Sequence, residues 1–232
     1  MTKLLCFAHR GASGYEPENT LSAVEKAIAL GADWIEVDVY AVENELIVIH
    51  DERLERTTNG TGFVMDKTLA YLRSLDAGKG QRIPTLREVF DCVDRRVGIN
   101  IELKGPYTVC STVSLIKEYV SNNGWNYDQF ILSSLNHREL TRVIKLDPHI
   151  KIGVIIGGRH RLYKQFVYRF AAYSVHPRID LINVRFVRSA HQRGLKVFVY
   201  TINEPDDIVR LEAMGVDGIF TDFPELISRR SS

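Results

Sequence analysis

The sequence has few cysteines and no long apolar run. Cys6, Cys92 and Cys110 are widely spaced and form no CxxC pair, which argues against a disulfide framework and predicts reduced thiols in a cytoplasmic protein. Only five residues precede Cys6, which leaves no room for a signal peptide before it. Since no apolar run approaches the roughly 18 residues of a membrane-spanning helix, we expect no stable membrane insertion.

The sequence also lacks an excess of charge of either sign. Its formal net charge of +1 gives neither nucleic acid nor an anionic membrane an overall attraction. We therefore expect no nucleic-acid partner, and any charge that matters for function must be local. The 232 residues are 45% hydrophobic, which suffices for one domain with a large core. The sequence does not distinguish a monomer from a homodimer.

Short apolar segments alternate with amphipathic helical segments along most of the chain. This alternation requires a parallel sheet, because each helix carries the chain back to the start of the next strand. Eight such units in this length favour a closed (β/α)₈ TIM barrel over an open doubly wound sheet. The predicted strands are 4–8, 34–39, 97–103, 129–133, 151–156, 173–175, 196–200 and 218–220. The predicted helices are 20–30, 85–93, 108–122, 136–146, 161–172, 180–193, 205–214 and a terminal helix.

One stretch interrupts this alternation. Residues 45–49 follow a Glu43-Asn44 turn signal, and they either pair antiparallel with the second strand or extend it. Residues 52–82 are rich in Thr, Gly and Asp, with weak helical periodicity only at 68–75. We interpret 52–82 as a small insertion after the second strand, at one end of a single domain that spans 1–232.

Acidic residues lie within two strands that are otherwise apolar. Barrel strands are buried on both faces, so a charge within one needs a partner. Glu36 and Asp38 are two residues apart and share a strand face, and Glu102 repeats this arrangement one strand later. Three converging carboxylates predict a site for one hard divalent cation, Ca²⁺ or Mg²⁺. The alternative is a structural ion-pair cluster in which Lys104 neutralises one acid.

Two histidines stand at strand ends, where barrel enzymes place their chemistry. His9 ends the first strand, and His50 ends the short segment after the second strand. A pair of imidazoles can take a proton from one oxygen and deliver one to a leaving oxygen near neutral pH. Arg10 and Lys104 add positive charge suited to phosphate oxygens. His176, which ends the sixth strand, is a weaker candidate for the same end of the barrel.

An ordered set of short motifs runs along essentially the whole chain. In order they are His9-Arg10-Gly11, Pro17-Glu18-Asn19-Thr20, Glu36-Val37-Asp38-Val39, His50-Asp51, Arg56-Thr57-Thr58-Asn59-Gly60, Ile83-Pro84-Thr85-Leu86, Ile101-Glu102-Leu103-Lys104, Val199-Tyr200-Thr201-Ile202-Asn203 and Gly218-Ile219-Phe220-Thr221-Asp222-Phe223-Pro224. This set resembles the glycerophosphodiester phosphodiesterase family. One departure is Tyr200-Thr201, where the family often has Trp-Thr, so the position keeps an aromatic side chain.

The resemblance implies a metal-dependent enzyme that hydrolyses small glycerophosphodiesters to glycerol 3-phosphate and an alcohol. Residues 52–82 would then cap the mouth of the barrel and shape the alcohol pocket. The implied site consists of the metal ligands Glu36, Asp38 and Glu102, the catalytic acid–base pair His9 and His50, and the substrate-binding residues Arg10, Lys104 and Tyr200.

Two other functions are compatible with the same residues. Phospholipase D-like or lysophospholipase D-like activity on longer lipids would use the same site, and an apolar rim on 52–82 would favour it, although that segment is mostly polar. A non-catalytic barrel that binds a phosphate ligand or a membrane surface would use the basic and aromatic residues of 159–172. An ordinary outer barrel helix with its charges in water also explains that segment.

Overall fold

The computed structural model describes residues 3–158, 167 and 172–228, and in this part of the chain eight parallel strands close into a barrel. These strands are β1 (Leu5–Ala8), β2 (Trp34–Val42), β4 (Gly98–Leu103), β5 (Phe130–Ser134), β6 (Lys151–Ile156), β7 (Ser174–Pro177), β8 (Lys196–Val199) and β9 (Gly218–Thr221). Their order in the sheet is β1, β9, β8, β7, β6, β5, β4, β2, and pairing of β1 with β2 closes the ring. The predicted (β/α)₈ TIM barrel is confirmed.

A further strand, β3 (Glu45–Val48), lies outside the ring. It pairs antiparallel with the second half of β2, with Val39 opposite Val48 and Val42 opposite Glu45. The first of the two arrangements predicted for 45–49 is therefore the observed one. The hairpin extends β2 beyond the barrel, and it brings His50 back toward the end of the barrel at which β4 and β5 end.

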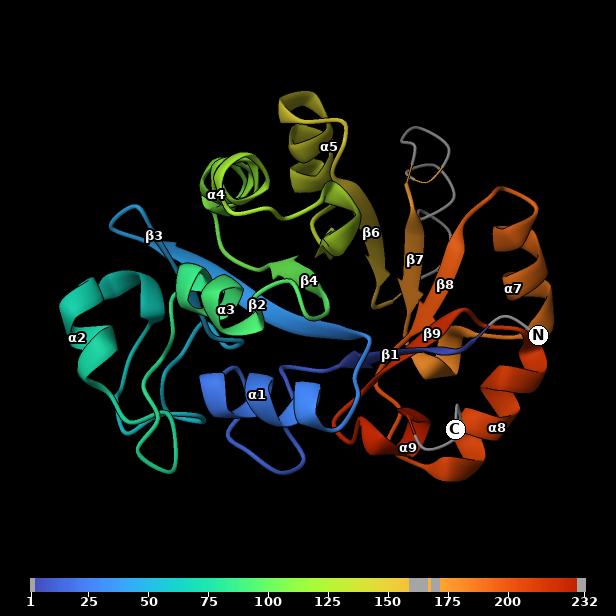
Figure 1. Ribbon diagram of the computed structural model, residues 1–232, viewed down its shortest axis with the longest axis horizontal. Coiled ribbons are helices and arrows are strands. Elements are labelled where there is room, and N and C mark those ends of the chain that lie inside the picture. The colour runs from blue at the N-terminus through green and yellow to red at the C-terminus, as the bar shows by residue number, and fades with distance from the viewer. Residues whose placement is uncertain (1–2, 159–166, 168–171, 229–232) are drawn as a thin grey trace.

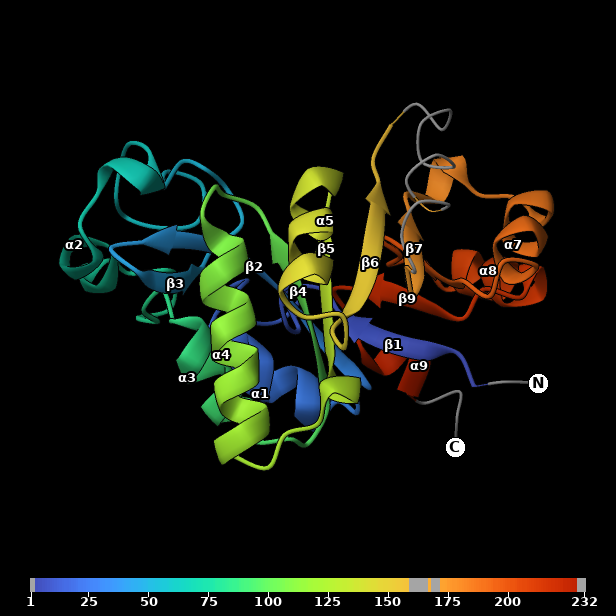
Figure 2. The ribbon, with the colours of Figure 1, turned by 90° about the horizontal axis from the view of Figure 1, so that it is seen from above.

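Helices surround the barrel, as Figures 1 and 2 show from two directions. They are α1 (Leu21–Ala29), α2 (Leu69–Ser74), α3 (Leu86–Val93), α4 (Thr108–Asn122), α5 (His137–Leu146), α7 (Val184–His191), α8 (Pro205–Met214) and α9 (Glu225–Ser228), with the 3₁₀ turns η1 (Val64–Asp66), η2 (Tyr127–Gln129) and η3 (Ile179–Leu181). The helix predicted at 161–172 falls largely outside the described residues. Among those described, none of the helices combines the length and apolar character needed to cross a bilayer.

Local capping explains where several helices begin. The Thr20 side chain accepts a hydrogen bond from the Ala23 amide at the start of α1, and Thr85 forms a capping box with Glu88 at the start of α3. The helix predicted at 180–193 is shorter than expected. It begins at Val184, because the Asn183 side chain accepts from the backbone at the first turn and the preceding residues form η3.

The core has an outer and an inner layer. The outer layer lies between the strands and the helices and contains Ile35, Val37 and Val39 of β2, as their alternation with the acidic residues predicts. The inner layer fills the barrel with large side chains, Phe7, Ile131, Phe198 and Phe220. This inner layer closes the barrel beneath its mouth, so polar side chains that point inward near the strand ends meet above an apolar floor.

The segment 52–82 packs against the β2–β3 hairpin. A separate apolar cluster joins the two, with Leu54, Val64 and Leu72 from the segment meeting Tyr40 and Ile47 from the hairpin. In Figures 1 and 2, α2 and β3 lie at one end of the molecule, and α7 and α8 lie at the other. The weak helical periodicity predicted at 68–75 corresponds to α2.

Candidate active site

A cavity of about 200 Å³ opens at the carboxyl ends of the barrel strands. It is lined by seven of the eight site residues predicted from the sequence, namely His9, Arg10, Glu36, His50, Glu102, Lys104 and Tyr200. The eighth, Asp38, is only 1% exposed and lies beside this lining. Tyr200 donates from its hydroxyl to the Ile156 carbonyl at 3.3 Å, which fixes its ring at the edge of the cavity.

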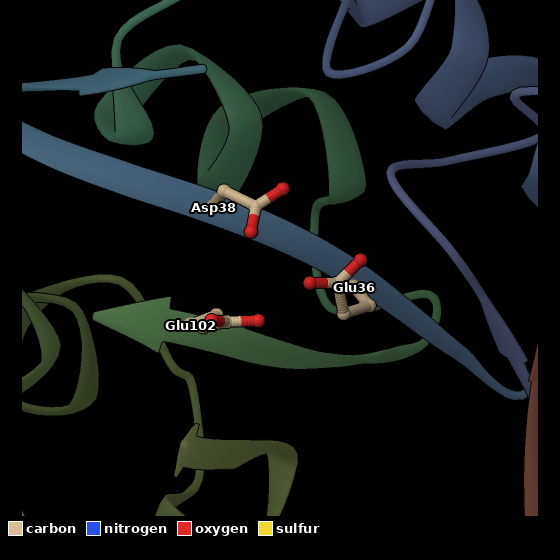
Figure 3. Close-up of side chains that lie close together, drawn as sticks. All are labelled: Glu36, Asp38 and Glu102. Atoms are coloured by element: carbon tan, nitrogen blue, oxygen red, sulfur yellow. The ribbon is translucent and has the colours of Figure 1, made fainter. Parts of the chain in front are cut away.

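The three acidic residues converge because of strand register. Parallel pairing of β2 with β4 places Asp38 opposite Glu102 and Glu36 opposite Asn100. Side chains of paired positions point to the same face of a sheet, so all three carboxylates face the barrel interior (Figure 3). One oxygen from each lies within 4.8 Å of the other two, which is close enough for a single cation to contact all three.

The carboxylates repel one another in a buried setting. Burial, and then the charges of Asp38 and Glu102, raise the pKa of the Glu36 carboxyl well above its usual range. Burial and Asp38 likewise raise the pKa of Glu102. Lys104 relieves part of this, with its Nζ 3.0 Å from Glu102 and 3.7 Å from Asp38. Arg10 adds a second positive charge, with its Nε 3.6 Å from Asp38.

These contacts permit a choice between the metal site and the ion-pair cluster predicted as its alternative. Lys104 and Arg10 supply two positive charges against three carboxylates. Among the residues that the structure describes, the buried Asp38 Oδ1 has no hydrogen-bond partner. Buried polar atoms are rarely left unpaired, and hard cations favour carboxylate oxygens. The donor set therefore fits one divalent cation better than a closed ion-pair cluster.

Asn19 holds the second acidic side chain in place. Its Nδ2 donates to Asp38 Oδ2 at 2.9 Å, and its Oδ1 accepts from the Asp38 amide at 3.3 Å. Asn19 adopts a left-handed backbone conformation with φ of 58°, which asparagine tolerates better than most residues. The two adjacent polar residues divide their roles, because Thr20 caps α1 and Asn19 contacts Asp38.

His9 is oriented by an aspartate from the far end of the chain. Its Nδ1 donates to Asp222 Oδ1 at 2.7 Å, which leaves Nε2 available to the cavity. Asp222 also accepts from Ser13 at 2.8 Å and from Asn203 at 2.6 Å. Burial opposes ionisation of Asp222, yet the hydrogen bonds from His9, Asn203 and Ser13 outweigh it and lower its pKa to about 2.

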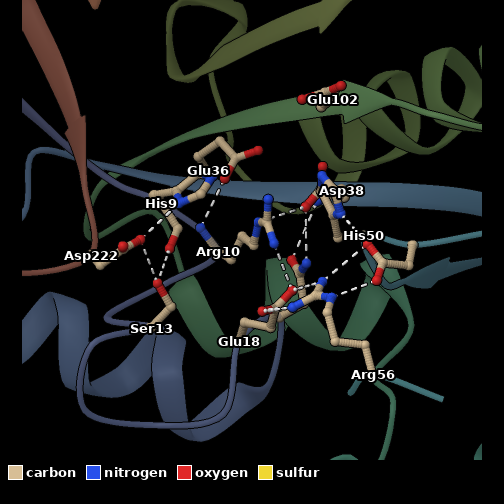
Figure 4. Close-up of polar contacts among 12 residues, drawn as sticks. His9, Arg10, Ser13, Glu18, Glu36, Asp38, His50, Arg56, Glu102 and Asp222 are labelled. Carbon is tan, nitrogen blue, oxygen red and sulfur yellow. Dashed lines mark hydrogen bonds and ion pairs between the residues drawn. The ribbon is translucent and has the colours of Figure 1, made fainter. Parts of the chain in front are cut away.

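His50 is oriented in the same way by its neighbour in sequence. Its Nδ1 donates to Asp51 Oδ1 at 2.5 Å, and its Nε2 lies 3.1 Å from Lys104 Nζ. A protonated lysine is only a donor, so Nε2 is the unprotonated nitrogen of a neutral imidazole. Burial lowers the pKa of His50 below its usual 6.5, despite the raising effect of Asp38 and Asp51. The two histidines thus stand on either side of the acidic residues (Figure 4).

His176 lies at the floor of the cavity and is only 1% exposed. Its Nε2 is 2.8 Å from Ser174 Oγ, and Gly153 on the neighbouring strand leaves room for the ring, since a Cβ there would come within 2.4 Å of it. Burial alone lowers the pKa of His176 to about 3. The weaker candidate of the sequence is therefore a neutral residue beneath the site.

Several residues that shape the site were not singled out from the sequence. Asp222 was quoted only within a motif, and its pairing with His9 depends on barrel closure. The signal that could have found it is register: β1 and β9 pair with Ala8 opposite Thr221, so the next residue of each strand emerges at the same level. Ser13 and Asn203 carry no comparable signal, because their positions depend on loop conformation.

Known proteins are similar to this chain over nearly its full length. Residues 9–226 match the model of the glycerophosphoryl diester phosphodiesterase family. A glycerophosphodiester phosphodiesterase of Caldanaerobacter subterraneus is 41% identical, with 97% of this chain and 96% of that protein covered. An Oleispira antarctica phosphodiesterase, solved in complex with the product sn-glycerol-3-phosphate, superposes with a TM-score of 0.89 at 30% identity, covering 98% and 97% of the two chains. A Thermotoga maritima glycerophosphodiester phosphodiesterase gives 0.82 at 28% identity, covering 99% of each chain.

Proposed function

The chain belongs to the glycerophosphodiester phosphodiesterase family, and from this premise we propose that it hydrolyses glycerophosphodiesters to glycerol 3-phosphate and an alcohol. The observation that carries the proposal is the placement of two aspartate-held histidines on either side of three converging carboxylates, of which Glu36 and Asp38 are buried. The substrate class is supported by the Oleispira antarctica structure, which contains sn-glycerol-3-phosphate. We further propose that the protein acts in the cytoplasm and that 52–82 caps the mouth of the single domain 1–232.

We propose that Glu36, Asp38 and Glu102 hold one divalent cation, Ca²⁺ or Mg²⁺. The three oxygens within reach of one another support this assignment, as does the Asp38 Oδ1, which has no hydrogen-bond partner among the described residues. When bound, the cation would supply Lewis-acid stabilisation of negative charge on the phosphate. Arg10 and Lys104 line the same cavity and would bind the remaining phosphate oxygens.

The two histidines divide the proton transfers in this proposal. His50 is neutral, and its unprotonated Nε2 can take the proton of the attacking oxygen, so we assign it as the base. His9, whose Nδ1 donates to Asp222, is the other histidine that lines the cavity. We therefore assign His9 as the acid that protonates the leaving alkoxide. Tyr200, at the edge of the cavity, would contact the substrate through its ring.

A panel of glycerophosphodiesters, each assayed with Ca²⁺, Mg²⁺ and Mn²⁺ after chelation, tests the function itself.

His9→Ala and His50→Ala should each lose most turnover of glycerophosphocholine while folding normally. In an aryl glycerophosphodiester the leaving group is good and needs little protonation. His9→Ala should therefore recover much of its lost turnover on that substrate, and His50→Ala should not. His149→Ala, whose side chain is 72% exposed and pairs with Asp147, is the matched control. Near wild-type rates in either site variant, with saturating metal, would rule out the histidine pair.

One observation favours a second candidate, hydrolysis of lysophospholipids. Leu135 lines the cavity and is 55% exposed, so it presents an apolar side chain at the site. A human relative named lysophospholipase D is 24% identical over 94% of this chain. Comparing glycerophosphocholine with lysophosphatidylcholine separates the two candidates. A kcat/KM for the lysolipid that exceeds the one for glycerophosphocholine would favour the second.

A further inference from the structure

One charged side chain of the insertion 52–82, that of Arg56, bonds two carboxylates next to the site, those of Asp51 and Glu18. Arg56 donates from Nε to Asp51 Oδ2 at 2.5 Å and from Nη2 to Asp51 Oδ1 at 3.0 Å. It also donates from Nη1 to Glu18 Oε2 at 2.6 Å and from Nη2 to Glu18 Oε1 at 2.8 Å. All three nitrogens of the guanidinium are used, and Figure 4 shows Arg56 below the two histidines.

Each of the two carboxylates that Arg56 binds also holds a residue of the cavity. Asp51 accepts from His50 Nδ1, and Glu18 accepts from Arg10 Nη1 at 2.8 Å. Arg56 is thus linked through Asp51 to His50, the proposed base, and through Glu18 to Arg10, the proposed phosphate-binding residue. We propose that Arg56 is a positioning residue of this site, which fixes the orientations of His50 and Arg10 at the same time.

The chemistry of this contact requires a guanidinium. Two ionised carboxylates that converge on one point repel each other, and the planar fork of arginine can bond both in parallel pairs, which a lysine cannot do. Its hydrogen bonds are the main cause that lowers the pKa of Asp51. They also help lower the pKa of Glu18 against the opposing effect of burial. Both carboxylates therefore stay ionised and able to orient their cationic or imidazole partners.

Because the Arg56 side chain is partly exposed, its effect on the positions of site residues can be told apart from an effect on folding stability. Its side chain is 47% exposed, and those of Glu18 and Asp51 are 20% and 27% exposed. Ion pairs this open to solvent contribute little to folding. If Arg56 served stability alone, replacing it would change little. If it positions His50 and Arg10, turnover falls while the folded fraction is unchanged.

The insertion provides a matched control in Arg73. This residue makes a bidentate ion pair with Glu88, at 2.7 and 2.5 Å, and donates to the Ile83 carbonyl at 2.5 Å. It fastens α2 of the insertion to α3 with the same number of charged hydrogen bonds to a carboxylate that Arg56 makes to Asp51. Arg73→Ala therefore loosens the insertion without removing a contact to Asp51 or Glu18.

The kinetic test compares Arg56→Ala, Arg56→Lys and Arg73→Ala on glycerophosphocholine, and this arm rests on the proposed function. Loss of a group that orients a site residue typically reduces activity about 10-fold or more, so we expect kcat to fall by that factor and KM to rise in both Arg56 variants. Arg73→Ala should shift the melting temperature and leave kcat within about twofold of wild type. Guanidinium chloride at non-denaturing concentration should restore part of the turnover of Arg56→Ala and none in Arg56→Lys.

A spectroscopic arm does not depend on turnover. In protein labelled with [¹⁵N]histidine, the His50 Nδ1–H signal should shift or broaden in Arg56→Ala and stay unchanged in Arg73→Ala. An unchanged His50 signal in folded Arg56→Ala overturns the proposal, as does an equal loss of kcat in both alanine variants. If the wild type hydrolyses no glycerophosphodiester, the proposed function fails, while the His50 signal still decides the role of Arg56.

Discussion

At the scale of single residues, the site depends on the hydrogen-bond partner at the Nδ1 atom of each histidine. An aspartate at Nδ1 fixes the tautomer and the ring orientation, and it stabilises the imidazolium that forms during proton transfer. For His50 this partner is its neighbour Asp51, whereas for His9 it is Asp222, at the other end of the chain. His50 and Asp51 are adjacent in the sequence, so their pairing can be read there. His9 and Asp222 come together only when the barrel closes.

Asp222→Asn should separate orientation from folding. An amide keeps the shape of the side chain but not the charge that holds the His9 Nδ1 proton, so we expect kcat to fall by about 10- to 100-fold. Asp217→Asn is the control, because Asp217 bonds His191 Nε2 at 2.8 Å and precedes β9, at the end of that strand opposite to Asp222. Steady-state kinetics on both variants decides the matter. Equal kcat values for the two would show that the charge of Asp222 has no role in turnover.

His176 should contribute to acid sensitivity of the fold. Its pKa is about 3 in the folded protein against 6.5 for an ordinary histidine, so below pH 6.5 the unfolded chain binds a proton that the folded chain refuses. Stability is therefore lost as pH falls from 6.5 toward 3, by up to about 1.4 kcal/mol per pH unit from this group. His176→Gln keeps a partner for Ser174 and should flatten this part of the curve. Urea unfolding at several pH values measures it, and parallel curves for both proteins would contradict the assignment.

At the scale of elements, alternation along β2 and β4 sorts side chains between two environments. Ile35, Val37 and Val39 reach the outer core, while Glu36 lines the cavity and Asp38 lies beside its lining. Period-two alternation is a property of the extended backbone, so it could be predicted from the sequence. The start of α7 could not be placed as well, because an Asn183 cap competes with earlier helical periodicity and only the observed hydrogen bond decides between them.

Thr85→Ala should weaken the fold without touching the chemistry. Thr85 and Glu88 form the capping box of α3, in which each side chain bonds the backbone of the other. Loss of the hydroxyl should lower the free energy of unfolding by about 1 kcal/mol. Denaturant titration measures the loss, and kcat and KM should match the wild type. Thr141→Ala, which removes a hydroxyl within α5 that bonds the His137 carbonyl, is the control and should cost less.

At the scale of the whole molecule, the insertion 52–82 contacts the barrel in two places. The insertion has its own apolar cluster with the β2–β3 hairpin, and Arg56 links it to the strand ends. The arrangement supports the proposal that 52–82 is a cap within one domain.

The cation should stabilise the whole fold, since it relieves repulsion among the three converging carboxylates. Removal with a chelator should abolish hydrolysis and lower the melting temperature, and Ca²⁺ or Mg²⁺ should reverse both effects. A ligand that binds only the folded state at 100 times its Kd adds about 2.7 kcal/mol. Differential scanning calorimetry with and without cation measures the gain, which Glu102→Gln should reduce. A melting temperature that is indifferent to chelator and cation would contradict the metal site.

The sequence by itself determined the barrel, the carboxylates of β2 and β4, and the two histidines at strand ends. These follow from local periodicity, from strand direction and from charges that an apolar strand cannot bury alone. Tertiary structure decided which groups meet: Asp222 with His9, Arg56 with Asp51 and Glu18, and Asn19 with Asp38. Such pairs join residues from separate strands and loops, and their distances depend on barrel closure and loop conformation, which a linear pattern does not encode.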